Sequence, residues 1–456
     1  MRKVTKKAPR RALYYSILGF AIIIIAAIFA YQTYNPLKDV DVPVTLASQD
    51  VSTTVLPNGL TVTVKELENS PLVTIQFWVR VGARNEEDKN RGISHIFEHV
   101  WFKGTEKQPV GSFHKRVESL GGELNAMTSF DWTMYFVTLP KDKFNDIFPN
   151  MVDLLLNPLF NETEISKELQ VIVEEQRFSF NNPTQYVDDQ FAQLLITDHP
   201  YHNPIIGYKD TILNATRDSI VDYYHQWYAP NNMNIIVAGN IDKDYVVNTV
   251  QKEFANFEKR QLPELNIRKL EAPAQNLYNT STRDIGYTYI ATGYFAPKAT
   301  DSDRYAMQVL NTILIAGDSS RIERILKQEK QLITQGVGAY VPLIETGVTQ
   351  TILTVEPEKA GQAKAELLYQ MNRFKTEEVT DEELERAKAI IITQRLREQE
   401  ELFQIGFAIG QAWVQNDSTI YTNYIDNINK VTKEDIKRVA NKYLTTYTMY
   451  ELKPKL

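Results

Sequence analysis

The feature that most constrains the fold of this chain is a sequence repeat between its two halves. The segment TRDSIVDYYHQWY (216–228) resembles TKEDIKRVANKYL (432–444). NETEISKELQVIVEEQRFS in the first half likewise resembles TDEELERAKAIIITQRLRE in the second. The first pair is offset by 432 − 216 = 216 residues. A repeat of this length indicates two duplicated domains rather than a solenoid of short repeats.

Each half combines strand signals with helix signals. TTVLPNGLTVTVKEL places Asn-Gly between alternating apolar runs, which predicts a hairpin, and LVTIQFWVRVG reads as a buried strand. Helical periodicity dominates from 141 to about 180 and again over 217–227. We therefore expect an α+β protein with two homologous α/β sandwich domains, each an antiparallel sheet packed with helices. The domains are expected at 51–256 and 281–456, joined by a charged linker over 257–280.

The N-terminus predicts a membrane segment. Residues 1–11 carry six Lys or Arg and no acid, and an uncharged run of twenty residues follows from Ala12. Twenty helical residues span roughly 30 Å, enough to cross the hydrocarbon core of a bilayer. We expect a single-pass anchor at 12–32 in the inner (cytoplasmic) membrane, a polar tether at 33–50, and a body that faces the periplasm. The alternative is a cleaved signal peptide and a secreted protein.

Composition excludes several classes of function. The net charge is −7 and the pI about 5.6, so nucleic acid is not expected as a partner. The chain has no cysteine, which excludes disulfides, thiol nucleophiles and cysteine-based zinc sites. His, Asp and Glu remain as metal ligands. All six histidines (95, 99, 114, 199, 202 and 225) fall in the first half, so histidine chemistry belongs there.

The segment GISHIFEHVWFKG (92–104) carries the strongest chemical signal. His95 and His99 are four residues apart, so both lie on one face of a helix and can bind one metal. Glu98 precedes His99 and is placed to take a proton from a water at that metal. The alternative is a surface helix with incidental histidines. The other four histidines lie in a Pro-rich turn segment or on ordinary helices, and we do not expect them to bind the metal.

A catalytic zinc site needs a third protein ligand, and one distant segment offers it. KELQVIVEEQRF contains Glu168, Glu174 and Glu175 on a long predicted helix. Glu168 and Glu175 are two turns apart and share a face, whereas Glu174 points about 100° away from Glu175. The matching segment of the second half, AKAIIITQR, lacks these acids. The site is therefore expected in the first half.

The motifs together resemble the pitrilysin-type (M16) family of zinc peptidases, which has an inverted H-x-x-E-H motif. That family includes the mitochondrial processing peptidase subunits and bacterial relatives. The resemblance covers nearly everything after Val51 and includes HIFEHVWFKGT, GGELNAMTS, ELQVIVEEQ, HPYHNPIIG and GDSSRIERIL. It implies a chain that forms half of a clamshell and cleaves peptides or unfolded segments.

The resemblance also implies roles for single residues. It assigns one Zn²⁺ per chain to His95, His99 and Glu175, makes Glu98 the general base, and makes Glu168 a supporting acid. Asn125, Ala126 and Thr128, in the stretch NAMT, resemble the edge strand on which a peptide substrate lies as an added strand.

The second half departs from the family pattern at two positions. Active members carry an Arg and a Tyr in the motif L-R-x-x-x-x-L-x-Y, which stabilises the oxyanion. Here Lys327 stands for the Arg and Thr334 for the Tyr. We therefore expect a homologous subunit to supply the Arg/Tyr pair in a heterodimer. The alternative is a non-catalytic subunit of the same fold that holds peptides or serves assembly. A purely structural zinc domain fits poorly, because such sites are closed by four ligands, usually with cysteine.

Overall fold

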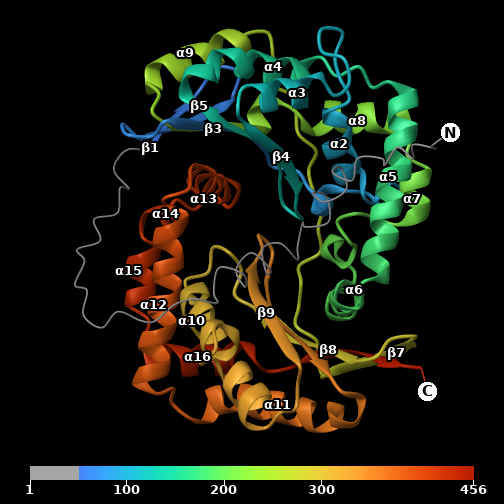
Figure 1. The fold of residues 1–456 in the computed structure, drawn as a ribbon, viewed down its shortest axis with the longest axis vertical. Coiled ribbons are helices and arrows are strands. Elements are labelled where there is room, and N and C mark those ends of the chain that lie inside the picture. The colour runs from blue at the N-terminus through green and yellow to red at the C-terminus, as the bar shows by residue number, and fades with distance from the viewer. Residues whose placement is uncertain (1–50, 456) are drawn as a thin grey trace, which may run out of the picture.

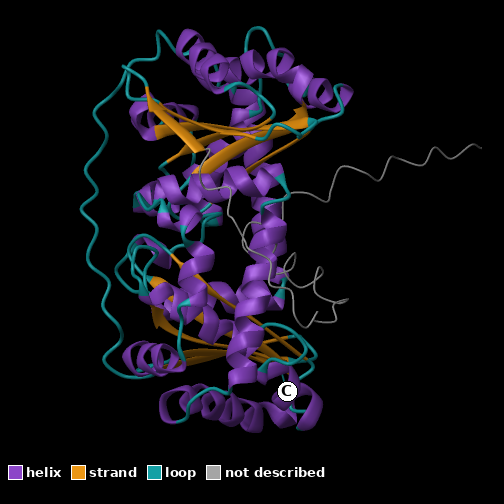
Figure 2. Cartoon of the chain, turned by 90° about the vertical axis from the view of Figure 1, so that its left-hand side faces the viewer, coloured by secondary structure: helices purple, strands orange, loops and turns teal. Residues whose placement is uncertain are grey.

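The computed structural model describes residues 51–455. The predicted basic segment (1–11), anchor (12–32) and tether (33–50) lie outside these residues, so the fold concerns the body alone. Among the helices of the described part, none combines the length and apolar character that a membrane span requires. Two sheets lie at opposite ends of the molecule with helices around and between them (Figures 1 and 2).

The first half is built on a six-stranded sheet in the order β1-β2-β6-β3-β5-β4. The strands are β1 (Val51–Val55), β2 (Thr61–Glu66), β3 (Leu72–Val79), β4 (Glu123–Thr128), β5 (Thr133–Pro140) and β6 (Met233–Gly239). The predicted hairpin is present as the antiparallel pair β1–β2. The expectation of a purely antiparallel sheet is wrong, because β2 and β6 are parallel. A long crossover separates these two strands in the chain, and such connections permit parallel pairing.

The helices of the first half lie around this sheet, except for one that packs on the second sheet, and one of them carries the histidine motif (Figure 1). They are α2 (Ile93–Trp101), α3 (Ser112–Ser119), α4 (Phe144–Leu156), α5 (Glu162–Asn181), α6 (Pro183–Leu195), α7 (Lys209–Leu213), α8 (Arg217–Trp227) and α9 (Lys243–Glu253). The predicted helix over 217–227 coincides with α8.

The second half repeats this plan with a five-stranded sheet in the order β7-β11-β8-β10-β9. The strands are β7 (Leu277–Arg283), β8 (Thr288–Ala296), β9 (Gln335–Pro342), β10 (Gly347–Val355) and β11 (Thr448–Pro454). The helices are α10 (Asp303–Ile315), the π-helix η7 (Ile322–Glu329), α11 (Ala360–Thr376), α12 (Asp381–Glu398), α13 (Leu402–Val414), α14 (Thr419–Thr422), α15 (Tyr424–Asn429) and α16 (Lys433–Tyr443).

The two sheets are duplicates in topology as well as in sequence. If β2 to β6 are matched in chain order with β7 to β11, the spatial orders are identical, and β7–β11 is parallel like β2–β6. The repeated helices α8 and α16 also begin in the same way. Thr216 accepts a hydrogen bond from the amide of Ser219, and Thr432 accepts one from the amide of Asp435. The sequence repeat therefore marks a structural repeat.

The two halves interlock by exchanging helices. From the second half, α13 packs on the first sheet, where Ile405 and Ile409 join Trp78 in an apolar cluster (Figure 1). In return, α6 of the first half packs on the second sheet, where Val187 and Phe191 contribute to another apolar cluster. The range 51–256 thus contains one helix whose apolar face is buried by the second half.

A long loop connects the halves between the end of α9 and the start of β7, along one side of the molecule (Figure 2). Strand β7 begins at Leu277, inside the range 257–280 that the sequence indicates as a linker. Arg260 fastens the loop to the first half through the carbonyl of His225, at 3.0 Å.

Candidate metal centre

Helix α2 presents the histidine motif because its beginning is fixed by its own neighbours. Gly92 has φ 94°, and a Cβ at this position would lie 2.6 Å from the carbonyl oxygen of Ile206. The carboxylate of Glu86 accepts hydrogen bonds of 2.8 Å from the amides of Gly92 and Ser94, at the start of the helix. Burial raises the pKa of Glu86 to about 7, although these two amides oppose the shift.

The apolar face of α2 orients the polar face toward α5. Ile93, Ile96, Phe97, Val100 and Trp101 are buried in the core of the first half. The three polar side chains of the motif lie on the remaining surface, where they are half-buried. Packing on one side of a short helix therefore decides where the motif points.

Helix α5 brings the acidic side chains to this surface. Asn161 caps the helix by accepting hydrogen bonds from the amides of Thr163 and Glu164. Glu175, two turns after Glu168, is buried and faces the histidines. Glu174 points away and forms an exposed ion pair with Arg177, 2.5 Å long. Helical geometry thus separates two adjacent glutamates, as their positions in the sequence predict.

His95, His99 and Glu175 form one compact group of potential ligands. One ligand atom from each of the three side chains lies within 4.8 Å of the others. Within residues 51–455, no second such group of histidine and acidic side chains is found. The structure therefore brings together the three residues that the resemblance implies as zinc ligands.

Two atoms of this group are buried without a hydrogen-bond partner, His95 Nδ1 and Glu175 Oε2. An unpaired buried polar atom is costly, and a metal ion held by this group would offer its ligand atoms a partner. Burial and the neighbouring His99 hold the pKa of His95 well below its usual value, so the imidazole is neutral, the form that binds metals. Two imidazoles and one carboxylate are a donor set that zinc prefers in catalytic sites. The side chains of His95, His99 and Glu175 therefore suit a zinc ion.

His99 is oriented by a second carboxylate. Its Nδ1–H donates a 2.9 Å hydrogen bond to Oε1 of Glu168, while its Nε2 lies 3.5 Å from Oε2 of Glu175. Burial lowers the pKa of His99, but the bond to Glu168 and the surrounding carboxylates outweigh it and raise the pKa overall. A partner at Nδ1 leaves Nε2 free to bind a metal, which is the common arrangement of histidine ligands.

Glu98 lies beside the group with a partner of its own. Thr128 Oγ1 donates a 2.5 Å hydrogen bond to Oε2 of Glu98. Burial raises the pKa of Glu98, and the nearby His99 and this hydrogen bond offset part of the shift. A carboxylate with a raised pKa can both accept and return a proton near neutral pH.

Strand β4 carries the residues predicted to bind the substrate. It is the last strand of its sheet and pairs only with β5 within the described part, so its other edge has no strand partner there. Asn125 is exposed on this strand, and its Oδ1 accepts from the amide of Ala126 at 2.9 Å. The hydroxyl of Thr128 donates its hydrogen bond to Glu98. The sequence does not predict this contact, because the two residues are thirty positions apart.

Lys327 and Thr334 both make contacts within the second half. Lys327 forms a 2.7 Å ion pair with Glu323 on the same π-helix. Thr334 Oγ1 donates a 3.1 Å hydrogen bond to the carbonyl of Thr354. Neither side chain carries a planar guanidinium or a phenol hydroxyl, the groups that the resemblance implies at these two positions.

Three of the remaining histidines have local partners. His199 Nδ1 accepts from the amide of Tyr201 at 3.1 Å, and His202 Nδ1 donates to the carbonyl of Ile196 at 2.7 Å. His114 packs against the ring of Phe102. None of the three belongs to the group of potential ligands formed by His95, His99 and Glu175.

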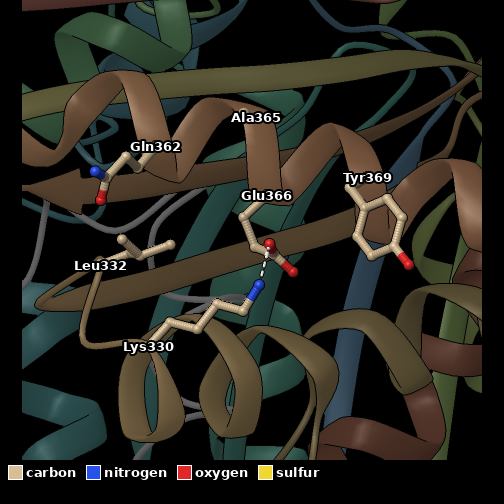
Figure 3. A pocket seen from close by; sticks show the side chains of 6 residues that line it. All are labelled: Lys330, Leu332, Gln362, Ala365, Glu366 and Tyr369. Atoms are coloured by element: carbon tan, nitrogen blue, oxygen red, sulfur yellow. Dashed lines mark hydrogen bonds and ion pairs between the residues drawn. The ribbon is translucent and has the colours of Figure 1, made fainter.

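A shallow groove of about 600 Å³ lies elsewhere, on the second half between α11 and the segment that follows η7 (Figure 3). It is lined by Lys330, Leu332, Gln362, Ala365, Glu366 and Tyr369. Lys330 and Glu366 form an ion pair across it, and it contains no metal-binding cluster.

Comparison with protein families gives two matches that together span both halves. The family described as Insulinase (Peptidase family M16) matches residues 61–209, which include the whole histidine motif and Glu175. The family described as Peptidase M16 inactive domain matches residues 214–391, most of which lie in the second half.

Several curated proteins are similar to this chain along most of its length. Zinc protease PqqE of Helicobacter pylori is 28% identical over 407 residues, which cover 88% of this chain and 92% of that protein. An uncharacterized zinc protease of Rickettsia felis is 27% identical, covering 86% and 95%. The probable mitochondrial-processing peptidase subunit beta of Arabidopsis thaliana is 24% identical, covering 88% and 77%.

Solved structures show the same fold. A protease from Helicobacter pylori superposes with a TM-score of 0.84 at 27% identity, covering 89% of this chain and 100% of that chain. A peptidase M16 inactive domain from Pseudomonas fluorescens reaches 0.82 at 15% identity, covering 89% and 98%, a likeness of fold alone.

Proposed function

This chain belongs to the M16 (insulinase) family of zinc peptidases, and from that premise we propose that it is an endopeptidase with one zinc ion held by His95, His99 and Glu175. The observation that carries the proposal is the convergence of these three side chains, with a buried unpaired atom on both His95 and Glu175. The substrates proposed are peptides or unfolded segments.

Glu98 is the proposed general base and acid. A zinc ion at this site would supply Lewis acidity, which lowers the pKa of a water and polarises a peptide carbonyl. Glu98 takes a proton from the attacking water and passes it to the leaving amine. The hydrogen bond from Thr128 holds one carboxylate oxygen, which leaves the other for the proton. Glu168 orients His99 through Nδ1.

The open edge of β4 is the proposed binding surface for the peptide. A substrate would add to the sheet as an extra strand and make main-chain hydrogen bonds along the edge with Asn125, Ala126 and Thr128. Main-chain recognition tolerates varied sequences, which suits an enzyme that acts on unfolded segments.

A homologous subunit is proposed to complete the site. Lys327 and Thr334 stand where active family members carry an Arg/Tyr pair. A partner that carries this pair would stabilise the oxyanion and form the other half of a clamshell. The similar protein from Arabidopsis thaliana is itself called a subunit.

The proposed location is the inner membrane, with the body facing the periplasm. The proposal rests on the basic segment 1–11 and the apolar run 12–32 of the sequence. Cleavage of that run as a signal peptide would give a secreted enzyme instead.

A second candidate is a non-catalytic subunit that holds peptides or serves assembly. The substitutions at Lys327 and Thr334 favour it. The buried polar group in the first half opposes it, because a scaffold has no need of such a group.

Hydrolysis of a quenched fluorescent peptide library separates these candidates. The full chain with stoichiometric zinc would be assayed alone and with a homologue that carries L-R-x-x-x-x-L-x-Y, with Glu98→Gln as the control. Cleavage only in the mixture, abolished by Glu98→Gln with zinc still bound, supports the split-site peptidase. Cleavage by the chain alone would remove the partner from the proposal. Bound zinc without cleavage in either case favours the peptide-holding subunit.

A further inference from the structure

A lysine lies behind the metal centre, two contacts away from it. Lys103 Nζ is 2.5 Å from Oε2 of Glu168, and Oε1 of the same carboxylate accepts from Nδ1–H of His99 at 2.9 Å. The three side chains are 22%, 13% and 12% exposed, so water has little access to the chain of contacts. Each oxygen of Glu168 therefore has its own charged or polar partner.

The backbone holds Lys103 at this place. The amide of Lys103 donates a 2.9 Å hydrogen bond to the carbonyl of Val100, in the turn that ends α2. Lys103 lies two residues beyond the end of α2, and its ion pair with Glu168 shows that its side chain turns toward α5. The ion pair thus joins the C-terminal end of α2 to the middle of α5.

This arrangement has a physical consequence for His99. A carboxylate held by one hydrogen bond can rotate about its last side-chain bond, and the imidazole that depends on it can then tilt. With Lys103 on one oxygen, Glu168 is held in the rotamer in which the other oxygen meets Nδ1–H. Partners of this kind fix the ring orientation of histidine ligands and strengthen their binding to metals.

We propose that Lys103 is a positioning residue of the metal centre, which acts on zinc binding through Glu168 and His99. The proposal rests on the proposed function, in that it takes His99 as a zinc ligand. It assigns Lys103 no contact with the substrate or the reacting atoms.

Lys103 could instead weaken zinc binding, so the direction in which zinc affinity changes when Lys103 is replaced distinguishes the two roles. A lysine ammonium near a cation site repels the cation, and removal of the ammonium would then tighten zinc binding. The positioning role predicts weaker binding on removal instead. The two effects differ in sign and in their dependence on Glu168.

The test is a measurement of zinc affinity in the full chain by competition with a chromophoric chelator. Lys103→Met is expected to weaken binding by about tenfold, the lower end of what partners of metal ligands contribute. Lys103→Arg, which keeps the charge, is expected to restore most of the affinity. Lys107→Met is the matched control, because Lys107 follows in the same connection and its ammonium is largely exposed, 4.0 Å from Asp153.

A double-mutant cycle decides whether Lys103 acts through Glu168. In the Glu168→Gln background, Lys103→Met is expected to have almost no further effect on zinc affinity. Independent, multiplying effects would overturn the proposal, as would tighter binding or unchanged affinity in Lys103→Met alone. If Lys103→Met does not fold, Lys103→Gln provides the same comparison with a polar side chain.

The result also separates this proposal from the proposed function. If the wild type binds zinc, and cleaves peptides together with the homologue, while Lys103→Met matches its zinc affinity, only the role of Lys103 falls. If the wild type binds no zinc, both fall.

Discussion

Thr128 Oγ1 donates a hydrogen bond of 2.5 Å to Oε2 of Glu98, which ties the edge strand β4 to helix α2. Thr128 is buried and Glu98 is half-buried, so water has limited access to the contact. A peptide that adds to β4, as we propose, would therefore lie on the strand that holds Glu98. In that case, substrate binding and the orientation of Glu98 depend on the same short strand.

We predict that Thr128→Val lowers kcat by about tenfold and leaves zinc affinity nearly unchanged. Valine keeps the shape but loses the donor, and a hydrogen bond to a charged group contributes about 1.5–3 kcal/mol. Thr128→Ser keeps the donor and should retain most of the activity. Steady-state kinetics on a fluorescent peptide give the comparison, and an unchanged kcat in Thr128→Val would show that Glu98 needs no such support.

Zinc is predicted to stabilise the folded chain through His95, His99 and Glu175. At free zinc a thousand times the dissociation constant, binding adds about 4 kcal/mol to the free energy of unfolding. Calorimetry with and without zinc should show the rise in Tm for the wild type and for Glu174→Gln, whose side chain points away from the site. Glu175→Gln should lose most of the rise. An equal rise in Tm with zinc in Glu174→Gln and Glu175→Gln would argue against Glu175 as a ligand.

We predict that Gly410→Ala destabilises the contact between the halves by about 1–3 kcal/mol, the range for overpacking a core. Its Cβ would lie 2.1 Å from the ring of Trp78, which is fully buried beneath α13. Gly361→Ala in α11 is the matched control, because its Cβ would meet nothing within 4 Å. That change should be neutral or stabilising by about 0.5 kcal/mol. Urea denaturation of both variants measures the difference, and a stable Gly410→Ala would mean that α13 can shift on the sheet.

Glu86 is predicted to make stability fall as pH rises. Burial raises its pKa from 4.5 to about 7 in the folded chain. The contribution of Glu86 to the free energy of unfolding is therefore fully present at pH values below 4.5 and is lost as pH rises through about 7. The free energy of unfolding of the wild type, relative to Glu86→Gln, should therefore drop by up to about 3 kcal/mol over this window. Urea denaturation at several pH values gives this difference, and a constant difference would show that the folded pKa of Glu86 is not raised.

Much of the candidate site can be predicted from the sequence because its parts are local. The spacing of His95, Glu98 and His99 places them together on α2. The spacing of the three glutamates of α5 places Glu168 and Glu175 on one face of that helix and Glu174 on another. Lys103 lies beyond the end of α2, so helical spacing does not place it, and only the structure shows its partner on α5. No spacing in the sequence predicts the contact of Thr128 with Glu98.

The sequence by itself determined the duplication, the α+β class, the bounds of α8 and the residues on the polar face of α2, because each depends on neighbours a few positions away or on a direct repeat. Only the tertiary structure decided the parallel pairing of β2 with β6 and the exchange of α6 and α13 between the halves. It also decided the bond from Thr128 to Glu98 and the ion pair of Lys103 with Glu168. These contacts join segments from thirty to more than three hundred residues apart, and which apolar face covers which sheet is settled by the packing of the whole chain.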